Sequence, residues 1–327
     1  MRHSGAEVVW ECLVREGVDI VWAYPGGAAL PIFDALGKYP QIRHVLVRHE
    51  QAAAHAADGY ARATGKVGVC LATSGPGATN LVTGIATAML DSVPIVALTA
   101  QVADSVIGTD AFQEINITGI TLPITKHNYL VRHSRDLVRC VREAFYLART
   151  GRPGPVLVDL PKDILIAPCE FHYPERISRP GYRPVVRSAP YQIQRAAQTI
   201  ADANRPVILA GHGVHVARAW EGLRRFAERI SAPVASTLLG LSAMSADHPL
   251  CLGMAGMHGV AWANLAVQNA DLLIALGMRM DDRLPATCGA LRPRRNCCMW
   301  TSIPRKSANG SPRPFPWWAT SGSYWRR

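Results

Sequence analysis

The chain of 327 residues is 49% hydrophobic and 18% charged, which is enough apolar material for the cores of two ordinary domains. It has no apolar run of the roughly 18 residues that span a membrane, no secretory signal and no CxxC pair among its eight cysteines, so we expect a cytoplasmic protein with reduced thiols and no membrane partner. The formal net charge is +11, but residues from Pro285 onward contribute +8 and leave only +3 for the first 284, so we expect no nucleic-acid partner.

The predicted elements of residues 1–165 alternate between helix and strand. A helix at about 4–17 precedes an apolar strand at 19–23, and the turn Tyr24-Pro25-Gly26-Gly27 follows it. Another helix, strand and helix extend to about residue 64. Four further strands are predicted at 67–72, 94–99, 127–131 and 155–159, with helices at 78–90 and 134–148. Short, nearly all-apolar strands separated by helices indicate a parallel sheet that is covered on both faces.

The rest of the chain divides into three stretches. Residues 166–190 are rich in proline and arginine without a period, and we expect them to link two domains. A second alternation over 191–284 predicts a smaller, partial domain, so the fold class is α/β with two doubly wound parallel sheets. Residues 285–327 show no helix or strand period and hold four tryptophans among prolines and arginines, so we expect an aberrant, disordered basic tail.

A candidate ligand site follows two neighbouring strands. Glu50 comes after an alternating apolar run and begins an alanine-rich helix, and Ser74-Gly75-Pro76-Gly77 comes directly after the strand at 67–72. A carboxylate and a glycine loop at the same end of parallel strands form a cleft suited to a cofactor with a nitrogen ring. Taken alone, a glutamate in a first helical turn is most often a helix-dipole residue, and glycines in such a turn are common.

The strings around these residues resemble a known family. RHEQAAAHAADGYARATGK (48–66) and TSGPGATNLVTGIATAMLDSVPIVALT (73–99) resemble the pyrimidine-binding domain of thiamine-diphosphate enzymes. IGTDAFQE (107–114) and ITKHNYLV (124–131) are most similar to acetolactate synthase large subunits, and the resemblance extends from about Gly5 to Arg283. It implies that Glu50 bonds the aminopyrimidine ring of the cofactor and relays a proton.

The same resemblance assigns further residues. It implies that Gln113, Lys162 and Arg283 line the substrate channel as catalytic residues, with Lys162 attracting the carboxylate of a 2-oxo acid. Without the family strings, Lys162 and Arg152 would be surface cations and Phe112 local core. The residues implied to contact thiamine diphosphate or FAD, besides Glu50, are Tyr24, Pro25, Gly26, Gly27, Ser74, Gly75, Pro76, Gly77, Asn80, Phe112, Arg152, Gly211, Met257, His258, Gly259, Gly277, Arg279 and Asp281.

Histidine spacing and the resemblance together give our expectations for metal ions and partner chains. The eleven histidines have no HExxH spacing, so we expect no metal site in this chain. The family's Mg2+ joins the diphosphate to a third domain, and the resemblance ends before that domain begins. Because the family's site is shared between subunits, the implied partners are a second copy or a full-length large subunit, and a regulatory small subunit.

Codon degeneracy suggests why the resemblance ends near Arg283. Met299-Trp300-Thr301 requires codons whose third-base frame encodes Val-Asp, and Trp317-Trp318-Ala319 likewise encodes Val-Gly. The family has VDIDPAE and VVGD at these places. We therefore expect a frameshift and a C-terminally truncated large subunit, and the coding DNA tests this expectation.

The implied lineage reaction converts two pyruvate molecules to 2-acetolactate and CO2 in isoleucine, valine and leucine biosynthesis. We expect this chain to be inactive alone, because it offers only the glutamate side of the site. Two alternatives remain open at this point: a different thiamine-dependent carboligase, or a non-catalytic binding or interaction remnant. Titration with thiamine diphosphate and magnesium beside a pyruvate assay separates the acetolactate synthase interpretation from the non-catalytic one.

Overall fold

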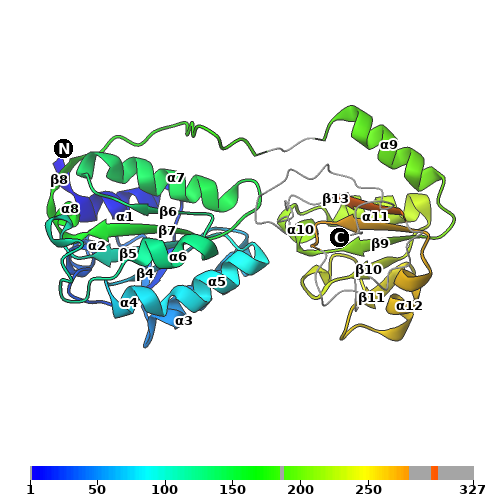
Figure 1. The fold of residues 1–327 in the computed structure, drawn as a ribbon, viewed down its shortest axis with the longest axis horizontal. Helices are drawn as coiled ribbons and strands as arrows, with labels where there is room; N and C mark the ends of the chain where they lie inside the picture. The colour runs from blue at the N-terminus through cyan, green and yellow to red at the C-terminus, as the bar shows by residue number, and fades with distance from the viewer. Residues whose placement is uncertain (1, 185–187, 280–295, 301–327) are drawn as a thin grey trace. The chain divides into compact units, whose positions relative to one another are not determined.

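The computed structural model describes residues 2–184 and 188–279 and the backbone of residues 296–300. The chain divides into two compact units, with the boundary after Pro184, and each is described by itself (Figure 1). Within the described ranges, none of the helices combines the length and the apolar character that crossing a membrane requires.

The first unit is built on a six-stranded, entirely parallel sheet. Its strands, in spatial order, are β3 (Arg43–Leu46), β2 (Ile20–Ala23), β4 (Gly68–Ala72), β5 (Ile95–Gln101), β7 (Val156–Pro161) and β6 (His127–Leu130). Strands β4 and β5 are buried along their whole length, which requires helices on both faces. The predicted parallel α/β class is confirmed.

Helices cover the two faces of this sheet in separate groups (Figure 1). Residues alternate along β4, so that Val69 and Leu71 pack in one core and Cys70 and Ala72 in the other. One face carries α1 (Gly5–Arg15), α2 (Leu30–Leu36), α7 (Leu137–Arg149) and α8 (Lys162–Ile166); the other carries α3 (Glu50–Thr64), α4 (Pro76–Asn80), α5 (Val82–Asp91) and α6 (Ile117–Thr121).

Local chemistry explains where the principal helices begin and end. A capping box starts α1: the Ser4 hydroxyl accepts from the Glu7 amide at 3.3 Å, and the Ser4 amide donates to Glu7 Oε2 at 2.8 Å. Helix α3 ends at Gly65, whose φ of 72° is the left-handed conformation that glycine adopts freely. Helices α3 and α5 approach closely because Gly84 faces Ala54; a Cβ on Gly84 would lie 2.4 Å from the Ala54 Cβ.

Some elements differ from those expected. The predicted helix 78–90 is divided at Leu81 into α4 and α5. Two strands far apart in sequence, β1 (Arg2–Ser4) and β8 (Pro168–Glu170), pair antiparallel, and three-residue pairings of this kind leave no period in the sequence. The described 3-10 turns are η1 (Asp104–Val106), η2 (Leu122–Ile124), η3 (Ser134–Asp136) and η4 (Leu238–Gly240).

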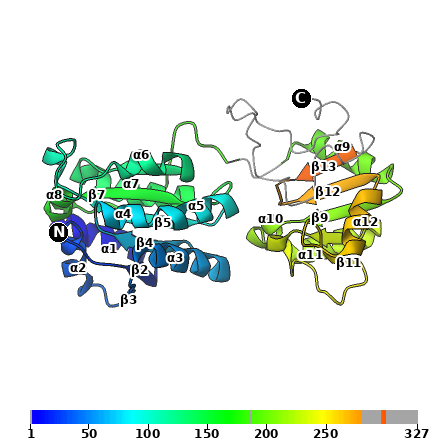
Figure 2. The same cartoon turned by 60° about the horizontal axis from the view of Figure 1, so that its bottom comes forward.

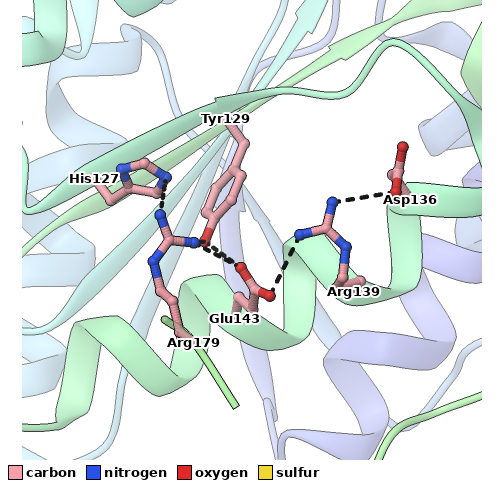
Figure 3. Close-up of polar contacts among 6 residues, drawn as sticks. All are labelled: His127, Tyr129, Asp136, Arg139, Glu143 and Arg179. Atoms are coloured by element: carbon pink, nitrogen blue, oxygen red, sulfur yellow. Dashed lines mark hydrogen bonds and ion pairs between the residues drawn. The ribbon is translucent and has the colours of Figure 1, made fainter. Parts of the chain in front are cut away.

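The predicted linker 166–190 is attached to the first unit as far as Pro184. Arg179 provides one anchor of this segment (Figure 3). Its Nη1 donates to Tyr129 Oη at 2.9 Å and to Glu143 Oε2 at 2.8 Å, and its Nη2 lies 3.0 Å from His127 Nε2. Glu143 is also bonded by Arg139 at 3.3 Å. A three-residue strand pairing and scattered side-chain contacts hold this segment, which explains why its aperiodic sequence suggested a free linker.

The second unit contains a parallel sheet with helices on both faces (Figure 2). Helix α11 packs in one core through Leu223 and Ala227, and α12 in the other through Ala263 and Val267. The strands, in spatial order, are β11 (Cys251–Met254), β10 (Val234–Ser236), β9 (Pro206–Ala210), β12 (Leu272–Leu276) and β13 (Asn296–Trp300), and the helices are α9 (Pro190–Ala201), α10 (His212–Val216), α11 (Trp220–Ile230) and α12 (Ala261–Asn269).

Strand β13 corrects part of the expectation for the tail. Its backbone pairs in parallel with β12, in a register that sets Leu272 opposite Asn296. The edge of β12 offers unpaired N–H and C=O groups that any extended segment can use, so this strand needs no sequence period. The other residues of 285–327, for which disorder was predicted, lie outside the described residues.

Candidate functional site

The predicted site residues of the first unit come together at one edge of its sheet. Residues 24–27 follow β2, Glu50 follows β3, residues 74–77 follow β4 and Lys162 follows β7. All these strands are parallel, so their carboxyl ends share one edge. Strand β3, which follows β2 in the chain, lies on one side of β2, and the next strand, β4, lies on its other side. In open α/β sheets, ligands bind at the point where the strand order reverses in this way.

Glu50 is the first residue of α3 and is only 8% exposed. Asn80, the last residue of α4, donates from Nδ2 to Glu50 Oε2 at 2.9 Å. The N-terminus of α3 favours the negative charge. Among the described residues, Glu50 Oε1 accepts no hydrogen bond, so the carboxyl group is held on one side only.

Two glycines bring the loops after β2 and β4 against each other. A Cβ on Gly26 would lie 2.5 Å from Thr73 Cγ2, and a Cβ on Gly77 would lie 2.7 Å from that same methyl and 3.1 Å from Glu50 Oε1. Real Cβ atoms do not approach so closely, so both positions require glycine. Thr73, Gly77 and Glu50 are therefore immediate neighbours.

Thr73 also carries an unsatisfied polar atom. Its Oγ1 is buried and has no hydrogen-bond partner in the part of the chain that the structure describes. A buried hydroxyl without a partner costs roughly 1–3 kcal/mol, and such groups call for an explanation. Here the Thr73 side chain lies beside Gly26 and Gly77 and near Glu50, of whose two carboxyl oxygens one has a hydrogen-bond partner among the described residues. This is the arrangement of a polar ligand site.

The loop after β5 lies against the glycine loop. A Cβ on Gly75 would be 2.5 Å from the Gln113 carbonyl oxygen, and Gly75 has a φ of 57°. Gln113 itself has a φ of 57°, which is uncommon for a residue with a side chain. Phe112 is 88% exposed, so it is not local core. The backbone N–H groups of Gly108 and Ala111 lower the pKa of the Glu114 carboxyl that closes this loop.

Arg152 is not brought to this edge. It precedes β7 and donates from Nε to the Ser92 hydroxyl at 2.7 Å, and Ser92 precedes β5. Both therefore lie at the amino edge of the parallel sheet, opposite Glu50. The neighbouring Lys126 is half-buried, and this burial, with the charge of Arg152 as a second cause, lowers its pKa to about 8.

In the second unit the predicted residues again follow the strands. Gly211 follows β9 and Gly277 follows β12, and the Gly211 amide donates to the Leu276 carbonyl at 2.9 Å. A Cβ on Gly277 would lie 2.6 Å from the Gly213 Cα, so these turns pack backbone to backbone. After β11 and β12, the predicted contacts Met257, His258 and Arg279 are exposed, and Gly259 is intermediate. Asp281 and Arg283 lie outside the described residues.

Three buried polar residues were not predicted. Thr73 stood inside the glycine string but was not singled out. Gln101 and Asp159 are 3% and 1% exposed; Gln101 is the last residue of β5, and Asp159 lies inside the otherwise apolar β7. A polar residue in such a strand is the signal that could have found them.

Comparison with known proteins identifies the family of both units. The family described as "Thiamine pyrophosphate enzyme, N-terminal TPP binding domain" matches residues 3–120, and "Thiamine pyrophosphate enzyme, central domain" matches residues 193–294. The chain is 54% identical to an acetolactate synthase of Arthrospira platensis over 294 residues, covering 88% of this chain and 51% of the relative.

Two further relatives show similar identity and coverage. Identity is 52% to the acetolactate synthase large subunit of Corynebacterium glutamicum, covering 89% of this chain and 47% of the relative. It is 51% to the acetolactate synthase large subunit of Pyropia yezoensis, covering 86% of this chain and 48% of the relative. The chain spans about half the length of the curated relatives it matches. It therefore belongs to the thiamine pyrophosphate enzyme family, of which it carries the N-terminal TPP-binding domain and the central domain.

Proposed function

We propose that this chain supplies the pyrimidine-binding side of a thiamine diphosphate site in an enzyme of the acetolactate synthase type. The observation that carries the proposal is the buried Glu50 carboxyl, bonded on one oxygen by Asn80 and placed where the strand order reverses. The family match over residues 3–120 and the similarity to acetolactate synthases support it.

The residues present fit the aminopyrimidine of this cofactor. Glu50 Oε1 and the orphaned Thr73 hydroxyl offer polar partners, and Gly26 and Gly77 keep side-chain atoms away from both. When bound, thiamine diphosphate supplies the carbon nucleophile that attacks 2-oxo acids. Glu50 would hold and move a proton at the ring nitrogen, while Asn80 orients the carboxyl through Oε2.

Substrate-facing roles are proposed for residues at the same edge. Lys162 is exposed at the start of α8, where its ammonium group would attract the carboxylate of a 2-oxo acid such as pyruvate. Phe112 and Gln113 would border the path of that substrate from the loop after β5. For Arg283 we propose the same channel role on the resemblance alone.

The remaining cofactor and partner assignments are proposals as well. FAD contacts are proposed for Arg152 and for residues that follow the strands of the second unit, and Mg2+ would accompany the diphosphate. The second unit's candidates are Gly211, Met257, His258, Gly259, Gly277, Arg279 and Asp281. Partners of the acetolactate synthase type would be a further large subunit and a regulatory small subunit, acting in the cytoplasm in isoleucine, valine and leucine synthesis.

Calorimetric titration of the chain with thiamine diphosphate, with and without Mg2+, tests the proposal. We expect saturable binding that weakens at least tenfold in Glu50→Ala, because a charged group's hydrogen bond contributes roughly 1.5–3 kcal/mol. Glu221→Ala is the matched control, since Glu221 also lies in a helical first turn but belongs to the second unit. Absence of binding, or equal affinity in Glu50→Ala, would refute the proposal.

A further inference from the structure

A single buried side chain joins the two ends of the loop between β5 and α6. Gln101, the last residue of β5, accepts from the Val102 amide through Oε1 at 2.9 Å. Its Nε2 donates to the Ile115 carbonyl, also at 2.9 Å. The first and last residues of the stretch 102–115 are thus bonded to the two ends of one amide.

Asp159, on the neighbouring strand β7, fixes the orientation of this amide. Gln101 Nε2 also donates to Asp159 Oδ2 at 3.0 Å, and the Thr99 hydroxyl donates to Asp159 Oδ1 at 2.7 Å. The three side chains are at most 3% exposed. Asp159 Oδ2 accepts from Nε2 both when the group is ionised and when it carries a proton on Oδ1, and the Val102 amide, which only donates, requires the same orientation, so Nε2 rather than Oε1 faces Asp159. This leaves Oε1 for Val102 and the second hydrogen of Nε2 for Ile115.

The bonded loop needs such support, because its backbone is strained. Asp110 and Gln113 both have a φ of 57°, and conformations of this kind persist where the surroundings over-determine them. Inside the loop, Glu114 accepts from the Gly108 amide at 2.5 Å and from the Ala111 amide at 3.0 Å. These bonds shape the turn but do not attach it to the sheet.

The loop is placed at the candidate cofactor site. The Gln113 carbonyl lies against Gly75, two residues from Thr73 and from Gly77. The Asp104 amide donates to Asp163 Oδ1 at 3.0 Å, and Asp163 is adjacent to Lys162. A shift of the loop would therefore alter both the glycine turn and the approach to Lys162.

We propose that Gln101 is a positioning residue: its amide, oriented by Asp159, sets the place of Phe112 and Gln113 beside the cofactor and substrate. The loop-fixing part stands on the contacts above, whereas its consequence for a 2-oxo acid rests on the proposed function. The Gln101 amide is bonded to Val102, Ile115 and Asp159, so the proposed effect of Gln101 runs through the loop.

Hydrogen–deuterium exchange of the full chain, resolved by mass spectrometry, tests this role. In Gln101→Met, which keeps the length but loses the three bonds, we expect amides of residues 102–115 to exchange at least tenfold faster. Thr99→Val is the matched control, because Thr99 contacts Asp159 but not the loop, and it should change this exchange less than twofold. Gln101→Asn, a polar but shorter variant, should resemble Gln101→Met and serves if the latter does not fold.

Two results overturn the proposal. One is unchanged exchange of 102–115 in both Gln101 variants; the other is an equal rise along β5 and β7, which a merely structural role would produce. Thiamine diphosphate affinity is measured on the same samples. If the wild-type chain binds no thiamine diphosphate, the proposed function fails while the exchange result still decides whether Gln101 fixes the loop.

Discussion

Asn80 donates to the Glu50 carboxyl group at 2.9 Å across 30 residues of sequence. The two residues stand at the end of α4 and the start of α3, helices that pack on the same face of the sheet. The family resemblance implies that Asn80 contacts the cofactor, and the structure shows that its amide bonds the acid beside that site. A buried carboxyl with one fixed oxygen presents its other oxygen in a defined direction.

Loss of this bond should weaken cofactor binding. We expect Asn80→Ala to lower thiamine diphosphate affinity by about tenfold, which corresponds to about 1.4 kcal/mol, because Glu50 would be free to rotate. Asn269→Ala is the control, since within the described ranges the Asn269 amide bonds only a carbonyl of its own helix, α12, at 2.9 Å. Titration calorimetry measures both variants, and equal affinities would contradict the orienting role.

The glycines against Thr73 allow a paired test of steric fit. Gly77→Ala and Gly26→Ala should each lower the free energy of unfolding by roughly 1–3 kcal/mol, as overpacked sites do. Thr73→Ser removes Cγ2, the atom nearest the new methyl at Gly77, and should recover most of that loss. At Gly26 the Thr73 Cβ and Oγ1 would remain 2.6 and 2.7 Å away, so Thr73→Ser should recover little.

Urea denaturation of the single and double variants measures these differences. The chain offers its own control, because Thr73→Ser alone reports the effect of losing the methyl group. Equal recovery at Gly26 and Gly77 would contradict the expectation that, of the Thr73 atoms, the methyl alone limits Gly77 while Cβ and Oγ1 also limit Gly26.

Arg179 should stabilise the first unit through Glu143. The Glu143 side chain is 7% exposed and that of Arg179 is 28% exposed, so Arg179→Met leaves a buried carboxylate bonded by Arg139 and Tyr129. We expect a loss of about 1–3 kcal/mol in unfolding free energy. Arg225→Met, which removes an exposed ion pair of 3.8 Å, should cost less than about 1 kcal/mol.

The same variant has a spectroscopic consequence. Burial lowers the pKa of His127, and the charge of Arg179 lowers it further. Removing that charge should raise the pKa of His127, which NMR titration of its ring protons follows. A pKa that does not rise would show that Arg179 is not held beside the ring in solution (Figure 3).

Asp159 should make stability depend on pH. Burial raises its pKa from 3.8 to about 7, against the hydrogen bonds from Thr99 and Gln101. The folded protein then binds this proton more tightly than the unfolded chain does. Its contribution to stability is complete below about pH 4 and is lost as the pH rises through 7, at about 1.4 kcal/mol for each unit of pKa difference.

Asp159→Asn removes this titration and can keep both bonds, since the Thr99 hydroxyl accepts as well as donates. We therefore expect the variant to gain stability relative to the wild type between pH 5 and pH 8. Thermal unfolding across that range measures the gain, with the exposed Asp34→Asn as the control. Parallel stability curves for Asp159→Asn and the wild type would contradict the raised pKa.

The sequence alone determined the α/β class, the succession of the principal strands along the chain and the family. These features depend on local chemistry: apolar strands between helices, a carboxylate at a helix start, and a glycine turn after a strand. Glu50 and residues 74–77 could be placed at one edge because parallel strands send their carboxyl ends the same way. The strings around them identified the family.

Only the tertiary structure decided which side chains meet. No pattern links Asn80 to Glu50, Gln101 to Ile115 or Arg179 to Glu143, because each contact joins segments that fold together across many residues of chain. The same reason explains why residues 166–184 were expected to be free, and why Arg152 proved to lie at the edge opposite Glu50. Periodicity reports which face of an element is buried, whereas directed polar contacts depend on where the whole sheet brings distant residues.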